Sequence, residues 1–323
     1  MKNILKTGAS DQLDKRMDLC ILNGNKFIEN NLHEWRLTYD VDLEVTNHVI
    51  RCKASDRTIS NYYKDVIDLT KCQNSDGGWG DKRDDPDSKV RSSALTIQML
   101  LRSNRILNDK TVSASISRGL CYLLAKQDGE GRWFDPTWHY LDAISVAVGA
   151  LLFAVNQPEW FNSLYANSLK MGIAHIRTQR NTEGFWFYKS TGSPVTITAH
   201  LLPKCVAFDG VHDIDITSVY SLIKLQSPEG HWDDLNTDHT CDSIRAMMLT
   251  ASRAGSQDLY EAVYESSRKA IEWLLDASEN IGGGLGDKPG MLAHVERTCD
   301  GMDSIMKFQQ FCKDEQNLIN FWK

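Results

Sequence analysis

The sequence lacks the features that define several large classes of protein. No segment approaches the ~18 uninterrupted apolar residues of a membrane-spanning helix, and the N-terminal stretch has no long apolar core. We therefore expect neither a membrane span nor a signal peptide. The 36 Lys and Arg residues are outnumbered by 43 Asp and Glu residues, which gives a net charge of -7. Without a basic patch the chain is poorly suited to neutralise phosphates, so we expect no nucleic-acid partner.

Paired cysteines, prolines and strand patterns are equally scarce. The eight cysteines include no C-x-x-C pair and show no spacing typical of a disulfide framework. Most lie within apolar helical patterns, where free cysteine behaves as a small buried hydrophobe, and this fits a reducing cytoplasm. The chain has only seven prolines and no persuasive alternating segment. These absences favour an all-α protein.

What the sequence does contain is an internal repeat. In four segments a glutamine ends a helical pattern, glycine follows, and an aromatic residue stands six positions after the glutamine. The four pairs are Gln73 and Trp79, Gln127 and Trp133, Gln179 and Phe185, and Gln226 and Trp232. Glycine supplies the left-handed conformation that ends the first helix, and the glutamine can bond backbone groups left unpaired at helix ends. We therefore predict that the tryptophans at these positions are structural.

Two less regular helix–turn–helix units flank the four repeats and complete a set of six helix pairs. The bounds of the six units are roughly 12–54, 57–104, 112–155, 163–207, 212–254 and 257–312. They predict a single all-α domain over residues 1–323 with the architecture of an (α/α)6 toroid. In such a toroid an inner and an outer layer of helices surround a central cavity.

The repeat carries a resemblance to a known group of enzymes. Its four elements resemble the QW repeats of the terpene cyclase and protein prenyltransferase superfamily, and the resemblance covers nearly the whole chain. It implies an α/α toroid whose cavity holds an isoprenoid chain. Near the C-terminus, Gly282 to Gly301 is similar to the segment of prenyltransferase β subunits that supplies a zinc-binding histidine. His239 to Ile244 is similar to their D-x-C segment, which supplies an aspartate and a cysteine to zinc.

The residues matched to these zinc ligands argue against a metal. His239 stands at the aspartate position, Cys241 at the cysteine position and Arg297 at the histidine position. A guanidinium stays protonated and cannot bind zinc. The segment "DDLNTD", which ends at Asp238, is acidic where those enzymes hold a diphosphate with Lys and Arg. We therefore predict no metal cofactor, and Zn2+ or Mg2+ with Asp238 or Asp242 as a replacement ligand is the alternative.

A further segment, "HDIDIT" from His212 to Thr217, resembles the DxDD acid motif of class II terpene cyclases. Its fourth position is Ile216, and it runs directly into Gln226 at the end of an outer helix. Asp213 and Thr217 are therefore expected to cap that helix rather than to donate a proton.

The starts of the inner helices are the better place to look for chemistry, because all six are expected to face one mouth of the cavity. In chain order the polar residues there are Asp40, Asp42 and Glu44; Asp87 and Arg91; His139 and Asp142; Thr196, Thr198 and His200; His239, Cys241, Asp242 and Arg245; and Glu296, Arg297, Asp300 and Asp303. They predict a mixed, acid-rich rim around an apolar barrel.

Two of these helix starts contain a His-x-x-Asp pattern, which places both side chains on one helical face. A helix-start aspartate can be a cap whose pKa the helix dipole lowers, or an acid that a dry cavity keeps protonated for catalysis. Both interpretations stay open for Asp242 with His239 and for Asp142 with His139. The first pair is favoured as the catalytic one because it lies in the matched cavity segment.

The other predicted site residues would contact the substrate. Aromatic rings stabilise carbocations, and Trp138, Tyr140, Trp186 and Tyr188 lie at or near turns outside the regular repeat position. The predicted substrate-binding residues are Arg297, Arg245, Asp303, Trp138, Tyr140, Trp186 and Cys241.

Three functions remain open at this point. The favoured hypothesis is a cytoplasmic isoprenoid cyclase or isomerase in which a cavity-facing aspartate protonates the substrate. The second is a prenyltransferase-like enzyme with an altered zinc site, and the third is a non-catalytic toroid that binds a lipid or a protein. The expected partner is a small isoprenoid molecule. Peripheral contact with a membrane, a protein partner and a homo-oligomer stay open.

Overall fold

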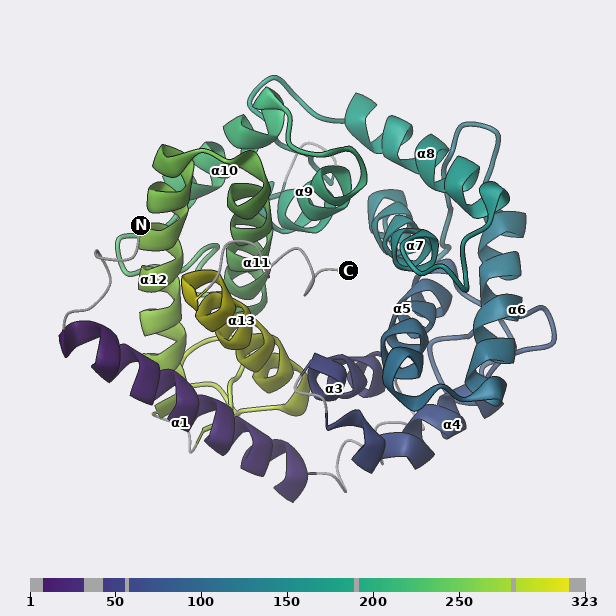
Figure 1. Ribbon diagram of the computed structural model, residues 1–323, viewed down its shortest axis with the longest axis horizontal. Coiled ribbons are helices and arrows are strands. Elements are labelled where there is room, and N and C mark those ends of the chain that lie inside the picture. Colours follow the sequence, from purple (N-terminus) through teal and green to yellow (C-terminus); the bar gives the residue numbers. More distant parts are fainter. Residues whose placement is uncertain (1–7, 32–42, 56–57, 189–191, 280–282, 314–323) are drawn as a thin grey trace.

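The computed structural model describes residues 8–31, 43–55, 58–188, 192–279 and 283–313, which fold into two concentric layers of helices (Figure 1). The inner layer contains α3 (Leu43–Ser55), α5 (Val90–Leu107), α7 (Tyr140–Val155), α9 (Val195–Asp209), α11 (Thr237–Ala254) and α13 (Val295–Lys313). The outer layer contains α1 (Gly8–Asn30), the short 3-10 helix η1 (Ile59–Tyr62) with α4 (Tyr63–Lys71), α6 (Lys110–Lys126), α8 (Ser163–Thr178), α10 (Asp213–Leu225) and α12 (Gln257–Glu279). Within these ranges the chain forms isolated β-bridges but no strand.

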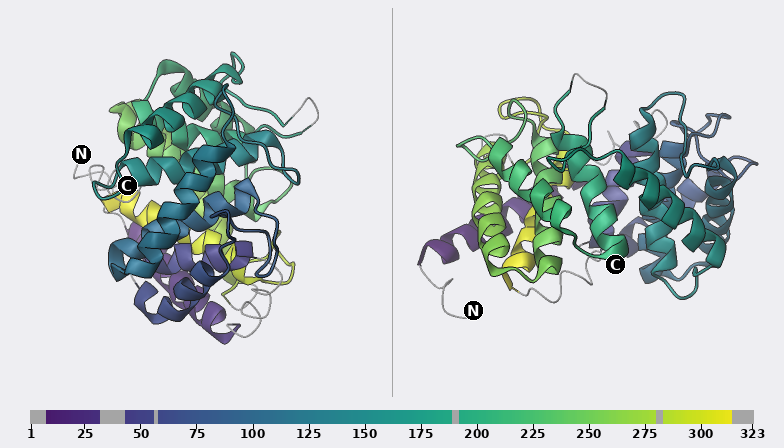
Figure 2. Two further views of the ribbon diagram at one scale, coloured as in Figure 1. Left: turned by 90° about the vertical axis from the view of Figure 1, so that its right-hand side faces the viewer. Right: turned by 90° about the horizontal axis from the view of Figure 1, so that it is seen from above.

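The inner helices form a closed ring. Each contacts the next one in chain order, and α13 contacts α3, so the last helix pair lies beside the first. The outer helices α6, α8, α10 and α12 each pack on the preceding inner helix as well, and α1 correspondingly covers α13. In side view the connecting loops gather at the two ends of the ring (Figure 2). The prediction of an all-α toroid is confirmed, and none of the described helices combines the length and apolarity needed to cross a membrane.

The repeated tryptophan and glutamine hold the turns of the toroid together. The indole of Trp79 donates to a carbonyl ten residues back at 2.8 Å, and the fully buried Trp133 and Trp232 make the same bond. The side-chain amide of Gln73 donates to a carbonyl of its own turn and, at 2.9 Å, to the carbonyl of Ser115 on α6. Each such pair therefore fixes one turn and joins two neighbouring outer helices. These tryptophans are structural, as predicted.

The turn between α8 and α9 differs from the prediction by one residue. Its buried indole is that of Trp186, which donates to the carbonyl of Ile176 at 2.7 Å. The guanidinium of Arg180 stacks on this ring at 3.9 Å, at the position where the other repeats have glutamine. Trp186, and not Phe185, is therefore the repeat aromatic. The prediction that Trp186 binds the substrate is wrong, because packing and the indole hydrogen bond occupy it fully.

The segment that resembles an acid motif begins α10 in the outer layer. His212 is the N-cap residue, and its backbone N–H donates to the carboxylate of Asp215 at 2.9 Å. Asp215 is fully buried and pairs with Arg180 at 2.6 Å. This segment therefore starts a helix and packs, as expected, although the cap is His212 rather than Asp213 or Thr217.

Candidate functional site

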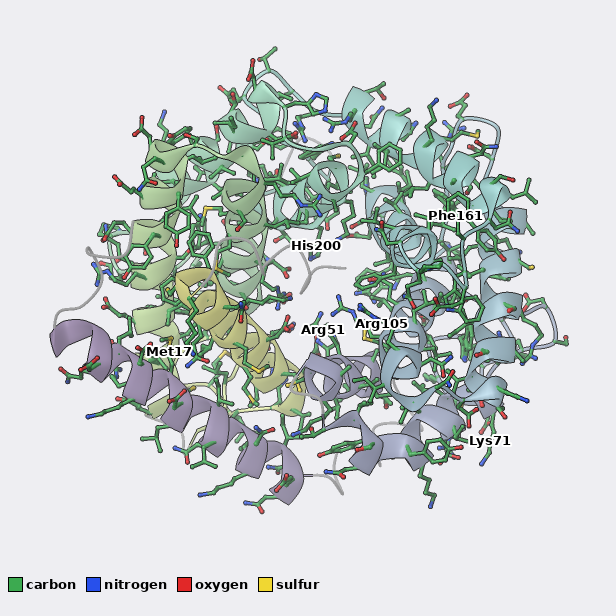
Figure 3. The ribbon with its side chains drawn as sticks, viewed as in Figure 1. Met17, Arg51, Lys71, Arg105, Phe161 and His200 are labelled. Atoms are coloured by element: carbon green, nitrogen blue, oxygen red, sulfur yellow. The ribbon has the colours of Figure 1, made fainter. Side chains whose placement is uncertain are left out.

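The inner helices enclose a cavity of about 640 Å³, which is within the size range of small-molecule sites. Each helix contributes one row of side chains, because residues three and four positions apart share a helical face. On α11 the row begins with Asp238, Asp242 and Arg245. The first residues of all six rows lie at one mouth of the cavity, and the last ones lie at its far end. Side chains such as Arg51 and His200 point into the ring (Figure 3).

The cavity has a mainly apolar wall and a charged wall. The apolar side chains come chiefly from α5, α7 and α9, and they are Leu95, Met99, Val146, Leu152, Phe153, Ala199, Pro203 and Ala207. The charged wall comes from α3, α11 and α13, and its residues are His48, Arg51, Asp238, Asp242, Arg245, Glu296, Arg297, Asp300, Asp303 and Lys307. The prediction of a barrel that is apolar all round is therefore wrong, because half of the ring carries ions over its whole depth.

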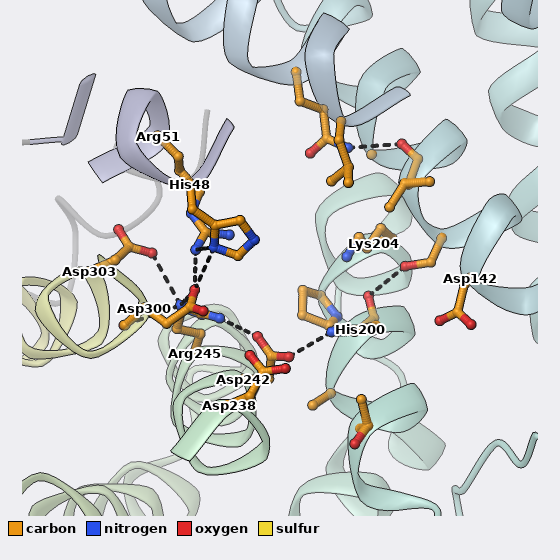
Figure 4. A pocket seen from close by; sticks show the side chains of 18 of the residues that line it. His48, Arg51, Asp142, His200, Lys204, Asp238, Asp242, Arg245, Asp300 and Asp303 are labelled. Carbon is orange, nitrogen blue, oxygen red and sulfur yellow. Dashed lines mark hydrogen bonds and ion pairs between the residues drawn. The ribbon is translucent and has the colours of Figure 1, made fainter. Parts of the chain in front are cut away.

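Asp242 is the centre of one chain of ion pairs (Figure 4). One of its carboxylate oxygens lies 2.6 Å from Nε2 of His200 on α9, and the other accepts a hydrogen bond from Arg245. Burial alone would raise the pKa of Asp242, but the charges of His200 and Arg245 outweigh burial and hold it well below the usual range. Asp242 is therefore a carboxylate without a proton to give, and this corrects its predicted role as the acid.

Asp300 on α13 is the centre of a second chain. Its carboxylate binds Arg51, accepts a hydrogen bond from Arg297 at 3.1 Å and lies 3.4 Å from Nδ1 of His48. Burial opposes ionisation here too, but His48 and Arg51 hold the pKa of Asp300 well below its usual range. Two ionised carboxylates are thus fixed in the charged wall.

Asp238 lies at the mouth of the cavity, where the negative charges of Asp242 and Asp300 act on it. Its side chain is 28 % exposed and lies 3.4 Å from Arg297. Burial raises the pKa of Asp238 to about 6, and the negative charges of Asp242 and Asp300 contribute to the increase. A carboxyl group with this pKa retains part of its protons near neutral pH, which suits it to general acid catalysis.

Among the described residues, one group of side chains has the spacing of a metal site, and it lies in the charged wall. His48, Glu296 and Asp300 bring ligand atoms to within 4.8 Å of one another. Hard divalent cations need free carboxylate oxygens. Both carboxylates are already bound to cations, since Arg297 lies 2.9 Å from Glu296 and Arg51 binds Asp300. These residues do not fit Zn2+ or Mg2+.

The two histidines predicted to support the acids lie elsewhere. Nδ1 of His239 is 2.9 Å from Asp233, so His239 does not brace Asp242. His139 is the N-cap residue of α7 and accepts a hydrogen bond from the backbone of Leu141 at 3.3 Å. In both cases the i, i+3 spacing puts the histidine and the aspartate on one helical face. The histidine nevertheless bonds to a different group, Asp233 for His239 and the Leu141 backbone for His139.

Tyr140 and Cys241 do not line the cavity either. The Tyr140 hydroxyl donates to Oε1 of Gln179 at 3.2 Å, in the turn that follows α8. Cys241 is fully buried, and burial raises the pKa of its thiol. It is therefore neither a substrate contact nor a thiolate ready to bind zinc, so both predictions for these residues are corrected.

The other predicted residues do line the cavity, namely Asp142, Asp242, Arg245, Arg297, Asp303 and Trp138. Trp138 is 41 % exposed at the mouth, and the guanidinium of Arg91 lies 4.0 Å from its ring. Asp142 accepts a hydrogen bond from the hydroxyl of Tyr188 rather than pairing with His139. Burial and this carboxylate together raise the pKa of Tyr188. Asp40, Asp42 and the side chain of Glu44 lie outside the described part of the chain.

Sequence reasoning missed the groups that reach the cavity from the middle of the inner helices. Arg51, Arg102, Lys204 and Lys307 line it two to three turns beyond the helix starts. Extending the three- and four-residue spacing from the rim residues along each inner helix would have predicted that these four cations line the cavity. They were overlooked because the barrel was expected to be apolar.

Comparison at the level of sequence finds nothing similar, since no family model and no curated protein matches the chain. Comparison of structures does find matches. The type II terpene cyclase MstE from Scytonema, as a variant in complex with geranylgeranyl dihydroxybenzoate, has a TM-score of 0.66 and 12% identity. The match covers 93% of this chain and 99% of the cyclase.

Two further structures are similar in the same way. A glycosyl hydrolase family 88 protein from Bacteroides vulgatus has a TM-score of 0.63 at 12% identity, with 92% of this chain and 99% of that chain covered. The ent-copalyl diphosphate synthase from Streptomyces platensis has a TM-score of 0.60 at 15% identity, with 83% and 50% covered. The chain therefore has a terpene cyclase-like α/α toroid fold, which enzymes acting on carbohydrates share.

Proposed function

We propose that this chain is an isoprenoid cyclase or isomerase that starts its reaction by protonating a carbon–carbon double bond, with Asp238 as the acid. The observation that carries the proposal is a carboxyl group with a pKa of about 6 at the mouth of a cavity that has an apolar wall. The fold supports an enzymatic function, because the similar structures are enzymes and include a cyclase bound to an isoprenoid substrate.

In the proposed step the O–H bond of Asp238 breaks and the proton forms a C–H bond with one alkene carbon. The other alkene carbon becomes a cation, and Asp238 is left as a carboxylate. Asp242 and Asp300 are ionised before the reaction begins, so they stabilise the positive charge without any rearrangement. A carbon next to the final cation then loses a proton to a cavity carboxylate, and the reaction needs no further reactant.

The two walls suit an isoprenoid chain that becomes positively charged during the reaction. A hydrocarbon chain laid against α5, α7 and α9 leaves water for Leu95, Met99, Val146 and their apolar neighbours. Each Å² of apolar surface buried in this way contributes about 25 cal/mol. The carboxylates Asp242 and Asp300 of the opposite wall then face the hydrocarbon, where the positive charge develops.

Turnover by Asp238→Asn tests the proposal. Wild type and variant are incubated with farnesyl diphosphate, geranylgeranyl diphosphate, squalene and an acidic oligosaccharide, and products are identified by mass spectrometry. We expect an isoprenoid product, with the rate of the variant reduced by roughly 100-fold or more because general acid catalysis is lost. Asp233→Asn is the matched control, since Asp233 pairs with His239 and does not line the cavity. Turnover of the oligosaccharide alone, or a normal rate for Asp238→Asn, would contradict the proposal.

A further inference from the structure

The charge of the cavity lining changes from the mouth to the far end. At the mouth the lining includes the acids Asp142, Asp238 and Glu296. Near the other end of the same barrel, α5 contributes Arg102 and α9 contributes Lys204. With a rise of about 1.5 Å per residue, the level of Arg102 lies roughly 16 Å along the helix axes from the level of Asp238. The two ends are therefore chemically distinct sites.

Two cations at the far end have no carboxylate partner among the described residues. The guanidinium of Arg102 stacks on the ring of Phe153 at 4.3 Å, and its Nε atom is buried without a hydrogen-bond partner. Lys204 projects into the cavity (Figure 4), and burial lowers the pKa of its ammonium group to about 8. Burial also lowers the pKa of Arg102, to about 10. Both residues are partly buried, and holding unpaired cations partly away from water costs free energy, which an anionic ligand would offset.

The neighbouring cations are compensated within the chain. Lys307 lies 2.7 Å from Asp303, while Arg51 and Arg245 bind the two carboxylates described above. Arg105 lies one turn beyond Arg102 on α5 (Figure 3), and its positive charge helps to lower the pKa of Arg102. Among the described residues that line the far end, the excess of positive charge therefore comes from Arg102 and Lys204. Its best match is a ligand with two or more negative charges, such as a phosphate or a diphosphate, rather than a single carboxylate.

We propose that the far end of the cavity binds the phosphate or diphosphate group of the substrate, with Arg102 and Lys204 as the principal contacts. This rests on the proposed function, because it assigns the anionic end of the substrate whose hydrocarbon lies against the apolar wall. The arrangement also places that group at the other end of the barrel from Asp238. The acid and the anion site then hold opposite ends of one molecule.

Calorimetric titration of the whole chain with inorganic pyrophosphate tests the site without any turnover. We expect Arg102→Gln and Lys204→Gln each to weaken pyrophosphate binding roughly tenfold or more, because each removes a charge-assisted contact. Arg91→Gln is the matched control. Arg91 lies on the same helix and covers the ring of Trp138 at 4.0 Å, but it stands at the mouth, so its loss should change the affinity less than about twofold.

Two further probes identify the ligand. Acetate should bind far more weakly than pyrophosphate, and farnesyl diphosphate should bind more tightly, because its chain buries apolar surface in the same cavity. Lys204→Arg should retain binding, and melting curves of all variants establish that they are folded. The proposal is overturned if pyrophosphate does not bind, if the mouth and far-end variants weaken it equally, or if farnesyl diphosphate binds no better.

The two proposals fail separately. If pyrophosphate binds as expected while Asp238→Asn has normal turnover, the acid is misassigned and the anion site stands. If Asp238→Asn abolishes turnover while pyrophosphate does not bind, the acid stands and the anion site is wrong.

Discussion

Replacing Asp242 with asparagine should lower the pKa of Asp238. After burial, the negative charge of Asp242 is the largest cause of the raised pKa of about 6. The substitution removes that charge, and it also leaves His200 without its carboxylate partner and Arg245 without its nearest one. Both changes make it easier for Asp238 to lose its proton, so they act in the same direction.

The size of the effect follows from the helix. Side chains four residues apart lie roughly 6 Å from each other. Two unit charges at that separation interact by about 2.8 kcal/mol at an effective dielectric constant of about 20, which corresponds to about two pH units. Asp238 is 28 % exposed, and solvent screening reduces the interaction by about half. We therefore expect the pKa of Asp238 to fall by about one in Asp242→Asn.

A carbon-13 NMR titration of protein labelled at the aspartate carboxyl groups measures this pKa directly. The signal of Asp238 is identified by its loss in Asp238→Asn. Asp142→Asn is the matched control, because it removes a carboxylate of the same cavity that is hydrogen-bonded to Tyr188. The control should leave the pKa of Asp238 where it is. An unchanged or higher pKa of Asp238 in Asp242→Asn would show that the charge of Asp242 does not raise it.

Three further predictions concern stability and metal content. Because the folded pKa of Asp238 is about 6 and the unfolded one about 4, ionisation destabilises the fold as the pH rises through 6. Asp238→Asn should therefore be as stable as wild type at pH 4. At pH 8 its free energy of unfolding should be higher by up to about 3 kcal/mol before screening, which a higher melting temperature would reveal. Trp232→Ala should cost about 3–5 kcal/mol in urea unfolding, and the exposed Trp138→Ala less than about 1 kcal/mol. Elemental analysis should find zinc well below one equivalent, since Cys241 is buried away from the cavity; a stoichiometric metal would contradict this.

Local patterns were sufficient to predict the architecture. The spacing from glutamine to tryptophan marks each turn, because the indole must reach a carbonyl ten residues back, and this gave Trp79, Trp133 and Trp232 their structural role. The same rule failed for Trp186, since Gln179 stands one residue before Arg180 and imitates the repeat. One ambiguous residue was enough to shift the register of that unit.

The candidate site was less predictable because its contacts cross between helices. Asp242 is paired with His200, which is 42 residues away in the sequence, and the nearby His239 turns to Asp233 instead. Which carboxyl group keeps its proton depends on such partners and on burial. Helix periodicity could place Asp238 at the mouth of the cavity, but it could not assign the pKa.

If Asp238 gives a solvent-derived proton to an isoprenoid double bond, a reaction run in D2O must label the product. The wild-type product should carry one deuterium at the carbon that is protonated first, and Asp238→Asn should form no labelled product. A wild-type product without deuterium, or the same labelled product from Asp238→Asn at an undiminished rate, would contradict the claim.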